Sequence, residues 1–326
     1  MQSEHILFVS KSAGDASTRY RGLQYYPFFY KIGYTTEHVT VSGGIKAFLN
    51  TLVLAYKADV VIVIRRTFPF FLTWLLRRVS KKLIFDMDDA IFCRSDGSVS
   101  KTRLNRFMCM AKASDHIFAG NQFLAEKALN FNNAVTIVPT SLKVQKYNVT
   151  VEPSNEYVDL VWIGSRSTSK YLLDILPELE ALAKKYTNLR LKIIADFDLP
   201  SAKLPIVAIP WSEENEVNEL LNSDIGVAPM RVNDWTRGKC ALKVLQYMAA
   251  RLPVVSSDVG VNGEAVDEGK TGLLVDSTKE WQTAISRLID EKSYRVELGN
   301  GGFEKVSRDY DINVIFKRIQ TVMESL

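Results

Sequence analysis

Apolar residues along the chain follow two patterns that alternate from one end to the other. Short, nearly unbroken apolar runs, such as Asp59–Ile64 and Val158–Ile163, are typical of strands buried on both faces of a sheet. Between them, apolar residues recur every three or four positions, as in Ser169–Tyr186, which predicts amphipathic helices. Strands that alternate with helices in this way indicate parallel sheets covered by helices on both faces. The predicted fold class is therefore α/β, with Rossmann-like, doubly wound sheets.

The alternation stops once, near the middle of the chain. Residues 145–157 are polar, include a proline and break the rhythm of strands and helices, so we place an interdomain linker there. A chain of 326 residues is also longer than one hydrophobic core usually supports. We expect one domain over residues 1–150, a second over 151–308 and a closing amphipathic helix within 309–326. Ligands of such folds bind at the carboxyl ends of the strands, which predicts a site in the cleft between the domains.

Composition excludes several classes of protein. With 47% hydrophobic and 24% charged residues, the chain has the composition of an ordinary globular protein. The fingerprints GxGxxG, GxxxxGK[ST] and GxSxG are absent, which argues against an NAD-type site, a P-loop and a serine nucleophile elbow. The three histidines and three cysteines lack metal-ligand spacing, so we expect no metal and no cofactor. So few cysteines, and an N-terminus without the features of a signal peptide, fit a reducing cytoplasm.

The two halves of the chain differ in charge. Residues 1–150 carry 20 Lys and Arg against 10 Asp and Glu, a net charge of +10, whereas residues 151–326 carry 21 against 27, a net charge of −6. The first half therefore suits an anionic partner: membrane headgroups, nucleic acid or a phosphate-bearing substrate. No nucleic-acid-binding module is recognisable, which disfavours the second of these. Residues 65–82 place aromatic and aliphatic side chains between basic clusters, as an interfacial helix requires, although a core-facing helix with charged ends fits the same pattern.

Two stretches in the second half have the features of phosphate-binding sites. A helical pattern over Lys239–Ala250 is apolar except for one polar stripe, Lys239, Lys243 and Gln246, and its N-terminus favours an anion. In the other stretch a strand ends at Gly164, and Arg166 and Lys170 lie around the start of the next helix. Surface helices with solvated lysines are the alternative at both places. Two stretches of this kind in one domain favour the binding of a single diphosphate by both.

An acidic cluster lies in the first half. Asp86, Asp88 and Asp89 stand at the carboxyl end of a buried strand, where carboxylates serve as a general base, a hydroxyl-orienting group or metal ligands. The spacing alone does not make a metal site, and helix capping by Asp88 or Asp89 is the structural alternative.

These residues, in this order, resemble the GT-B glycosyltransferases, in particular glycosyltransferase family 4 and its bacterial surface-polysaccharide members. Ile137–Thr140 is similar to the family pattern viPngvd, and Gly164–Lys170 to GRxxxxKG. The most specific likeness joins Leu245–Val255, Gly260–Val266 and Lys270–Val275 to LEAMAxGxPVVxSxxGGxxEIVxxGxxGLLV. The resemblance implies an acceptor-binding first domain, a nucleotide-sugar-binding second domain and a last helix that crosses back onto the first.

The chain departs from the family pattern at several positions. The family pairs two glutamates eight positions apart, near the donor sugar and the ribose, and here those positions are Gly238 and Gln246. Ser165 holds the slot of the family arginine, with Arg166 next to it. Where many members carry an active-site histidine, this chain has the acidic cluster. We interpret these departures as variation rather than inactivation.

The resemblance and the residues together predict a retaining glycosyltransferase of the hexosyltransferase type. It would move a sugar from a nucleotide-diphosphate-sugar to a lipid-linked or cell-surface glycan, as a cytoplasmic protein peripheral to an anionic membrane. Asp88, Asp89 and Lys243 are the predicted catalytic residues. The predicted donor-binding residues are Gly164, Arg166, Lys170, Lys239, Lys243, Gln246 and Glu264, and the acceptor-side residues are Gly14, Arg19, Arg21 and Asp86.

Two other functions stay open from the sequence. A nucleotide-sugar epimerase of the same fold would turn over its donor without an acceptor. A catalytically silent nucleotide-binding subunit is suggested by the missing glutamate at Gly238. The sequence leaves the sugar, base, linkage and acceptor unassigned, because substrate choice resides in loops.

Overall fold

A computed structural model of the protein describes residues 3–149 and 156–326. The chain divides into two compact units, each assembled from separate stretches of sequence. Unit 1 comprises Met1–Ser141, Asn233–Cys240 and Ile312–Leu326, and unit 2 comprises Leu142–Val232 and Ala241–Asp311. The predicted boundary at residues 150–151, and part of the predicted linker, lie outside the described residues. Asn233–Cys240 falls in unit 1, although the sequence pattern assigned it to the second domain.

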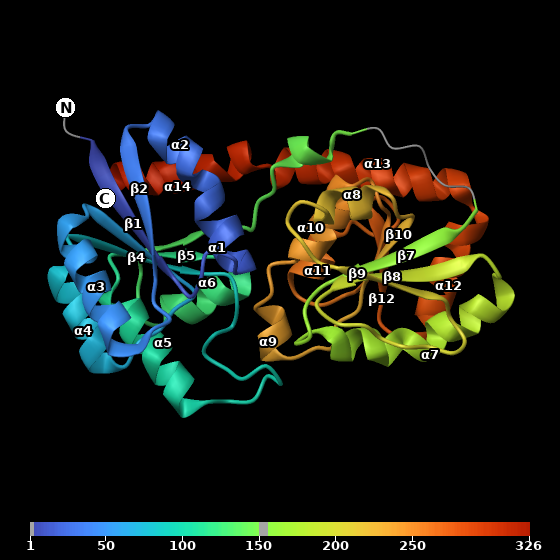
Figure 1. Ribbon diagram of the computed structural model, residues 1–326, viewed down its shortest axis with the longest axis horizontal. Coiled ribbons are helices and arrows are strands. Elements are labelled where there is room, and N and C mark those ends of the chain that lie inside the picture. The colour runs from blue at the N-terminus through green and yellow to red at the C-terminus, as the bar shows by residue number, and fades with distance from the viewer. Residues whose placement is uncertain (1–2, 150–155) are drawn as a thin grey trace. The chain divides into compact units, whose positions relative to one another are not determined.

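Unit 1 is built on a parallel sheet of six strands in the order β2-β1-β3-β4-β5-β6 (Figure 1). Unbroken apolar stretches such as Val60–Ile64 form the central strands, because both faces of this sheet are covered by helices. The strands are β1 (Glu4–Ser10), β2 (Tyr34–Thr40), β3 (Val60–Ile64), β4 (Lys82–Met87), β5 (His116–Ala119) and β6 (Val135–Ile137). The helices are α1 (Ala16–Arg21), α2 (Tyr26–Lys31), α3 (Gly44–Lys57), α4 (Phe70–Val79), α5 (Lys101–Ala113), α6 (Gln122–Leu129), α9 (Asp234–Arg237) and α14 (Ile312–Ser325), with a 3-10 turn at Leu23–Tyr25.

The two faces of the unit 1 sheet bury different helices. Ile84 of β4 belongs to a cluster that contains residues of α2 and α14, while its neighbour Phe85 contacts Phe107 of α5, with ring centroids 6.2 Å apart. Successive side chains of a strand point to opposite faces, so α5 covers the face away from α14. Helix α4 packs against α5, and α3 packs against α4. Helices α3, α4 and α5 therefore form one layer, and α2 and α14 form the other.

The last helix, α14, packs onto the first unit. Its apolar face inserts Ile315, Phe316 and Ile319 among residues of β1 and α2, and the Phe316 ring lies 5.1 Å from that of Phe29. This arrangement matches the predicted closing helix that returns to the first half of the chain.

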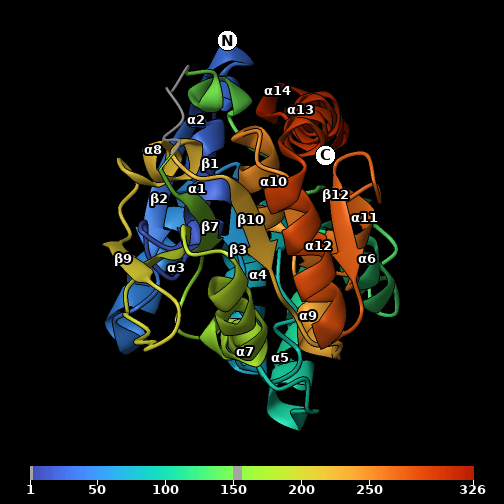
Figure 2. The same ribbon diagram turned by 90° about the vertical axis from the view of Figure 1, so that its right-hand side faces the viewer.

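Unit 2 has a second parallel six-stranded sheet, in the order β12-β11-β10-β7-β8-β9. Helices α7 and α12 pack side by side over one face of it (Figure 2), and α10 packs against α13. The strands are β7 (Val158–Ile163), β8 (Leu189–Ala195), β9 (Ile206–Pro210), β10 (Ile225–Ala228), β11 (Val254–Ser257) and β12 (Gly272–Val275). The helices are α7 (Ser169–Lys185), α8 (Glu216–Leu221), α10 (Leu242–Ala249), α11 (Val261–Ala265), α12 (Thr278–Asp290) and α13 (Lys292–Asp309), with a 3-10 turn at Val144–Tyr147.

The length and hydropathy of each helix decide whether it could span a membrane. Among the residues that the structure describes, every helix is too short or too polar to cross a bilayer.

Candidate active site

Arg21 and Asp86 form a buried ion pair at the carboxyl end of β4. Arg21 donates from Nε and Nη2 to the two carboxylate oxygens of Asp86, both at 2.8 Å, and from Nη1 to the carbonyl of Val138 at 2.5 Å. Their side chains are 1% and 4% exposed. Burial alone would lower the pKa of Arg21, but the Asp86 carboxylate outweighs it and raises that pKa. The prediction that these two side chains face an acceptor does not agree with this placement, because each already satisfies the other inside the core.

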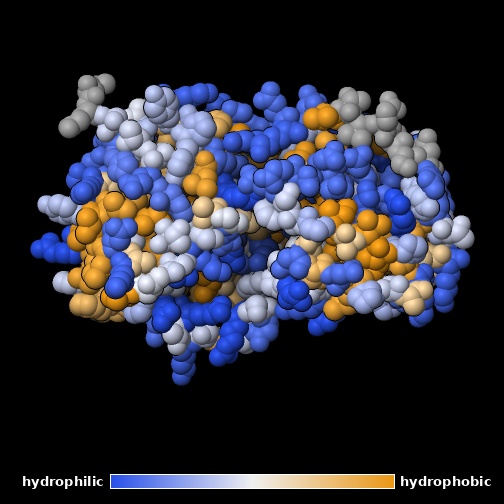
Figure 3. All heavy atoms as spheres, viewed as in Figure 1, coloured by the Kyte–Doolittle hydropathy of each residue, from blue (hydrophilic) through white to orange (hydrophobic). Residues whose placement is uncertain are grey.

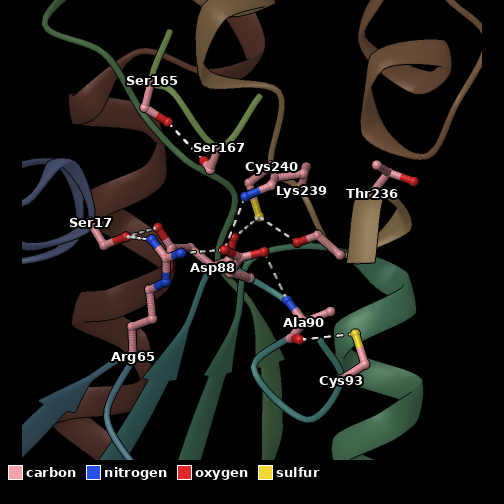
Figure 4. A network of polar contacts seen from close by, with 12 residues as sticks. Ser17, Arg65, Asp88, Ala90, Cys93, Ser165, Ser167, Thr236, Lys239 and Cys240 are labelled. Carbon is pink, nitrogen blue, oxygen red and sulfur yellow. Dashed lines mark hydrogen bonds and ion pairs between the residues drawn. The ribbon is translucent and has the colours of Figure 1, made fainter. Parts of the chain in front are cut away.

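Asp88 and Asp89, which follow β4, lie in a network with two cations (Figure 4). Arg65 contacts Asp89 through Nη2, and Lys239 Nζ lies 3.0 Å from the same carboxylate. The Asp89 carboxylate also accepts the backbone N–H of Ala90 at 3.1 Å. Three donors therefore contact the Asp89 side chain.

Asp88 is held less completely than Asp89. Its Oδ2 accepts the hydroxyl of Ser17 at 2.6 Å, and Ser17 in turn accepts Nη1 of Arg65 at 2.9 Å. The other oxygen, Oδ1, is buried and has no hydrogen-bond partner among the described residues; the Arg65 Nε lies 3.9 Å away. Arg65 also has a left-handed backbone, with φ of 51°, which is uncommon for a side chain of this size. Asp88 therefore has one carboxylate oxygen whose hydrogen-bonding capacity is unused among the described residues.

Residues 233–240 are fastened to unit 1 by contacts with the ends of β4 and β5. Asn121, the N-cap of α6, donates its amide to the carbonyls of Arg237 and Lys239 at 3.2 and 3.0 Å. The Cys240 thiol donates to the carbonyl of Asp88 at 3.3 Å. Burial, reinforced by the charge of Asp88, raises the pKa of Cys240, so the thiol stays protonated.

Gly238 lies in close contact with the backbone after Asp89. A Cβ added at Gly238 would stand 2.5 Å from the Cβ of Ala90 and 2.7 Å from its backbone nitrogen. No side chain fits there without moving the segment. Glycine at the family's first glutamate position is thus explained by packing in unit 1.

Adding a side chain at position 238 is therefore expected to destabilise the protein. Gly238→Glu and Gly238→Ala should each lower the stability of unit 1 by about 1–3 kcal/mol through overpacking. Gly14→Ala is the matched control for stability, because a Cβ at Gly14 meets nothing within 4 Å. Calorimetric melting measures the loss. A Gly238→Glu protein as stable as the wild type would contradict the packing argument.

In unit 2, the loop after β7 leads into the N-terminus of α7. The hydroxyl groups of Ser165 and Ser167 are 2.9 Å apart, and Ser169 donates to the carbonyl of Arg166 at 2.9 Å. The N-cap residue, Thr168, makes no side-chain cap; its hydroxyl donates to the Ser165 carbonyl at 3.1 Å instead. The Ser/Thr cluster would be expected to cap the helix, but these hydroxyl groups bond within the loop instead. Arg166 is exposed, and Lys170 lies in the first turn of the 17-residue helix.

Helix α10 holds Lys243 beside the end of β7. Tyr247 fixes the helix, because its hydroxyl accepts the N–H of Ile163 at 3.0 Å and donates to the Val227 carbonyl at 3.3 Å. Lys243 Nζ then lies 4.3 Å from the ring centroid of Trp162, the residue two positions before Gly164. The structure thus brings Lys243 to the strand that precedes Arg166 and the first turn of α7, which carries Lys170. Gln246, one turn further along α10, is buried.

The predicted stripe of Lys239, Lys243 and Gln246 is not one helix face. Helix α10 begins at Leu242, three residues later than predicted, after Ala241 in a left-handed conformation with φ of 53°. Lys239 belongs to unit 1, where Asp89 neutralises it, so it is placed away from the α10 stripe.

The other predicted site residues have these positions. Gly14 is exposed in the loop between β1 and α1, and Arg19 is half-buried on α1 over the ring of Tyr20, 5.1 Å away. Glu264 is exposed on the five-residue α11. Gly164 packs on the Trp162 indole, where a Cβ would stand 2.5 Å from the ring.

A pocket that the sequence analysis missed opens in unit 2, at the ends of β10, β11 and β12. Its volume is about 530 Å³. Its polar lining includes Asp174, Arg231, Asp258 and Asp276, and Arg231 is already bound by both oxygens of Asp174. Neither Lys170 nor Lys243 lines it. Three carboxylates against one paired cation disfavour a diphosphate there. Its residues directly follow predicted strands, which is the feature that would have revealed it.

The acidic residues do not converge on a common point. Within residues 3–149 and 156–326, no three His, Cys, Asp or Glu side chains are placed to hold one metal ion. Asp86 faces Arg21, while Asp88 and Asp89 face Arg65 and Lys239.

Part of the second half of the chain matches a known protein family. Residues 158–291 match the family described as "Glycosyl transferases group 1". The matched range begins with β7 and ends just after α12, so it contains both Lys170 and Lys243. The likeness to this family is thus confined to residues 158–291.

One curated protein is similar to part of the chain. A D-inositol 3-phosphate glycosyltransferase from Pseudarthrobacter chlorophenolicus is 32% identical over 135 residues, which are 39% of this chain. The match spans only 28% of that relative's length.

Solved structures resemble the whole chain, beyond the group 1 domain. Anabaena HepE in complex with UDP-glucose gives a TM-score of 0.75 at 14% identity, covering 99% of this chain and 100% of that one. Sucrose-phosphate synthase from Thermosynechococcus elongatus gives 0.73 at 14% identity, covering 99% and 98%. At this identity the likeness shows the fold, and the predicted GT-B fold class is confirmed.

Proposed function

We propose that the protein is a retaining glycosyltransferase, of the hexosyltransferase type and cytoplasmic. It transfers a sugar from a nucleotide-diphosphate-sugar to a hydroxyl of a lipid-linked or cell-surface glycan. The observation that carries this proposal is the glycosyl transferases group 1 domain, with two lysines at the carboxyl end of its strand β7. UDP and UDP-glucose in the HepE structures favour a nucleotide-sugar as the donor.

The donor diphosphate is assigned to cations and a helix end of unit 2. In the transfer, the bond between the anomeric carbon and the β-phosphate oxygen breaks, and negative charge develops on the leaving diphosphate. Lys243, Lys170 and the positive N-terminus of α7 neutralise that charge, with Arg166 in the preceding loop. Gln246 follows Lys243 by three positions on the same side of α10, and with Glu264 it is assigned to the nucleotide.

On the acceptor side, Asp88 is a better candidate than Asp89. Asp89 is saturated by Arg65, Lys239 and the Ala90 N–H, whereas Oδ1 of Asp88 lacks a hydrogen bond among the described residues. Asp88 would accept a hydrogen bond from the acceptor hydroxyl and orient it. The new bond would form on the face that the leaving group occupied, and the hydroxyl proton would pass to the departing diphosphate oxygen. Arg65 and Ser17 then keep Asp88 in place as positioning residues. Gly14 and Arg19 remain assigned to the acceptor side.

A panel of nucleotide-sugars tests the proposal. At about 100 times its Kd, the true donor should stabilise the protein by about 2.7 kcal/mol, seen as a raised melting temperature, and the other donors should not. With glycan acceptors added, that donor should release its nucleoside diphosphate and give a product with the donor's anomeric configuration by NMR. Nucleotide binding without release would instead identify a silent subunit, the reading that Gly238 favours, and turnover without an acceptor would identify an epimerase. Absence of any binding would overturn the proposal.

A further inference from the structure

Helix α3 has two apolar faces, and only one of them is covered. Phe48, Thr51 and Ala55 are buried against the rest of unit 1, and the Phe48 ring lies 5.2 Å from that of Phe68. A second apolar stripe, spaced i, i+4, i+8 and i+11, faces outward: Ile45, Leu49, Val53 and Tyr56. A helix on a sheet normally directs polar residues outward, so a regular apolar stripe there needs an explanation.

The neighbouring helix α4 continues this apolar surface. Its exposed residues include Phe70, Phe71 and Trp74, and the rings of the last two stack with centroids 6.1 Å apart. Helices α3 and α4 pack together, and Figure 3 shows apolar side chains gathered over the end of unit 1 where Figure 1 places them. The seven residues, which we term the α3–α4 patch, are each between 51% and 72% exposed: Ile45, Leu49, Val53, Tyr56, Phe70, Phe71 and Trp74.

The helices of this layer are exclusively basic. Helices α3, α4 and α5 contain no aspartate or glutamate but eight lysines and arginines: Lys46, Lys57, Arg77, Arg78, Lys101, Arg103, Arg106 and Lys112. Of these, Arg77 lies 3.2 Å from Asp115, while Lys46, Lys57 and Arg78 are exposed. Aromatic and aliphatic side chains bordered by lysine and arginine suit the interface of an anionic bilayer, where rings enter the headgroup region and cations meet lipid phosphates.

The apolar face of helix α14, in the same unit, is buried rather than exposed. Ile315, Phe316 and Ile319 are buried in a core cluster, so that face needs no partner. The α3–α4 patch lies on the other layer of the sheet, away from that cluster. Its exposure is therefore not a consequence of amphipathic helices in general.

We infer that unit 1 docks on an anionic membrane surface through the α3–α4 patch. The rings of Phe70, Phe71 and Trp74 insert among the headgroups, and the basic residues of α3, α4 and α5 contact lipid phosphates. A lipid bilayer is favoured over a second copy of the chain because the exposed cations of α3 and α4, Lys46, Lys57 and Arg78, would face their own copies and repel. The inference does not depend on the transfer chemistry proposed above.

Vesicle sedimentation of the full chain tests it. The protein should sediment with phosphatidylcholine vesicles that contain phosphatidylglycerol, bind pure phosphatidylcholine at least about tenfold more weakly, and be released by salt. The variant Phe70→Ser/Phe71→Ser/Trp74→Ser should lose affinity by at least about tenfold. Its melting temperature should stay close to that of the wild type, because these side chains are exposed. Tyr30→Ser on α2 is the matched control, since Tyr30 is equally exposed but lies on the opposite layer.

Three results would overturn the inference. The first is a wild-type protein that sediments with neither vesicle, and the second is a triple variant that binds as the wild type does. The third is a wild-type dimer, measured by light scattering, that the triple variant dissociates. Loss of vesicle binding with donor binding intact, or the reverse, separates this inference from the proposed function.

Discussion

Replacing Lys243 with alanine is expected to lower kcat for sugar transfer by about 100-fold, the effect of removing one preorganised charge-stabilising group from a transition state. Lys243 is held beside Trp162 by a helix that Tyr247 fastens to β7 and β10, so its ammonium group is positioned before the donor arrives. The negative charge of the leaving diphosphate is fully developed only as the glycosidic bond breaks. The variant should therefore lose kcat more than donor affinity, which stopped-flow release of nucleotide and calorimetric binding measure separately.

Two variants control this experiment. Lys243→Arg keeps the charge and should retain a larger share of kcat than the alanine variant does. Lys184→Ala removes an exposed lysine from the far end of α7 and should leave kcat unchanged. If Lys243→Ala keeps its transfer rate within about threefold of the wild type, Lys243 does not stabilise the leaving group.

Local sequence patterns were sufficient to predict the architecture. The unbroken apolar run at Asp59–Ile64 predicted a buried strand, and the structure forms β3 over Val60–Ile64. Such runs are informative because a strand inside a parallel sheet is apolar on both faces, whatever its distant neighbours are. The same local logic predicted α7 and α14, whose apolar positions recur with helical spacing.

Long-range contacts determined the parts that sequence patterns did not reveal. Residues 233–240 join unit 1 because Asn121 binds the carbonyls of Arg237 and Lys239 and because Gly238 packs on Ala90. The spacing of apolar residues along the sequence carries no information about contacts between residues more than a hundred positions apart. The start of α10 was missed for a related reason, since Ala241 adopts a left-handed conformation that sequence signals reserve for glycine.

The sequence showed where polar and charged residues cluster, but not the environment of each one. The sequence located the acidic cluster. It did not reveal that Arg21 neutralises Asp86 in the core, or that one oxygen of Asp88 lacks a hydrogen-bond partner among the described residues. Their difference depends on which cation each strand end meets. The exposed stripe of α3 was missed because apolar residues on both faces of a helix predict burial unless the neighbouring layer is known.

The Arg21–Asp86 pair leads to the largest expected change in stability. Arg21→Met should lower the free energy of unfolding of unit 1 by about 3–5 kcal/mol, because it leaves the Asp86 carboxylate buried without a countercharge. It also removes a donor from the Val138 carbonyl. Calorimetry and native-state hydrogen exchange of the β4 amides measure the loss in the unit concerned.

The dependence on pH and a double variant identify the cause of that loss. Burial already raises the pKa of Asp86 against the opposing effect of Arg21, and removing Arg21 raises it further. A carboxyl group with a raised pKa in the folded state binds more protons there than when unfolded, so stability falls as pH rises through that pKa. The loss in Arg21→Met should thus be smaller at acidic than at neutral pH. Arg21→Met/Asp86→Leu, which removes both charges, should recover most of the stability at neutral pH. If the double variant is as unstable as the single one, lost packing rather than an unpaired charge is responsible.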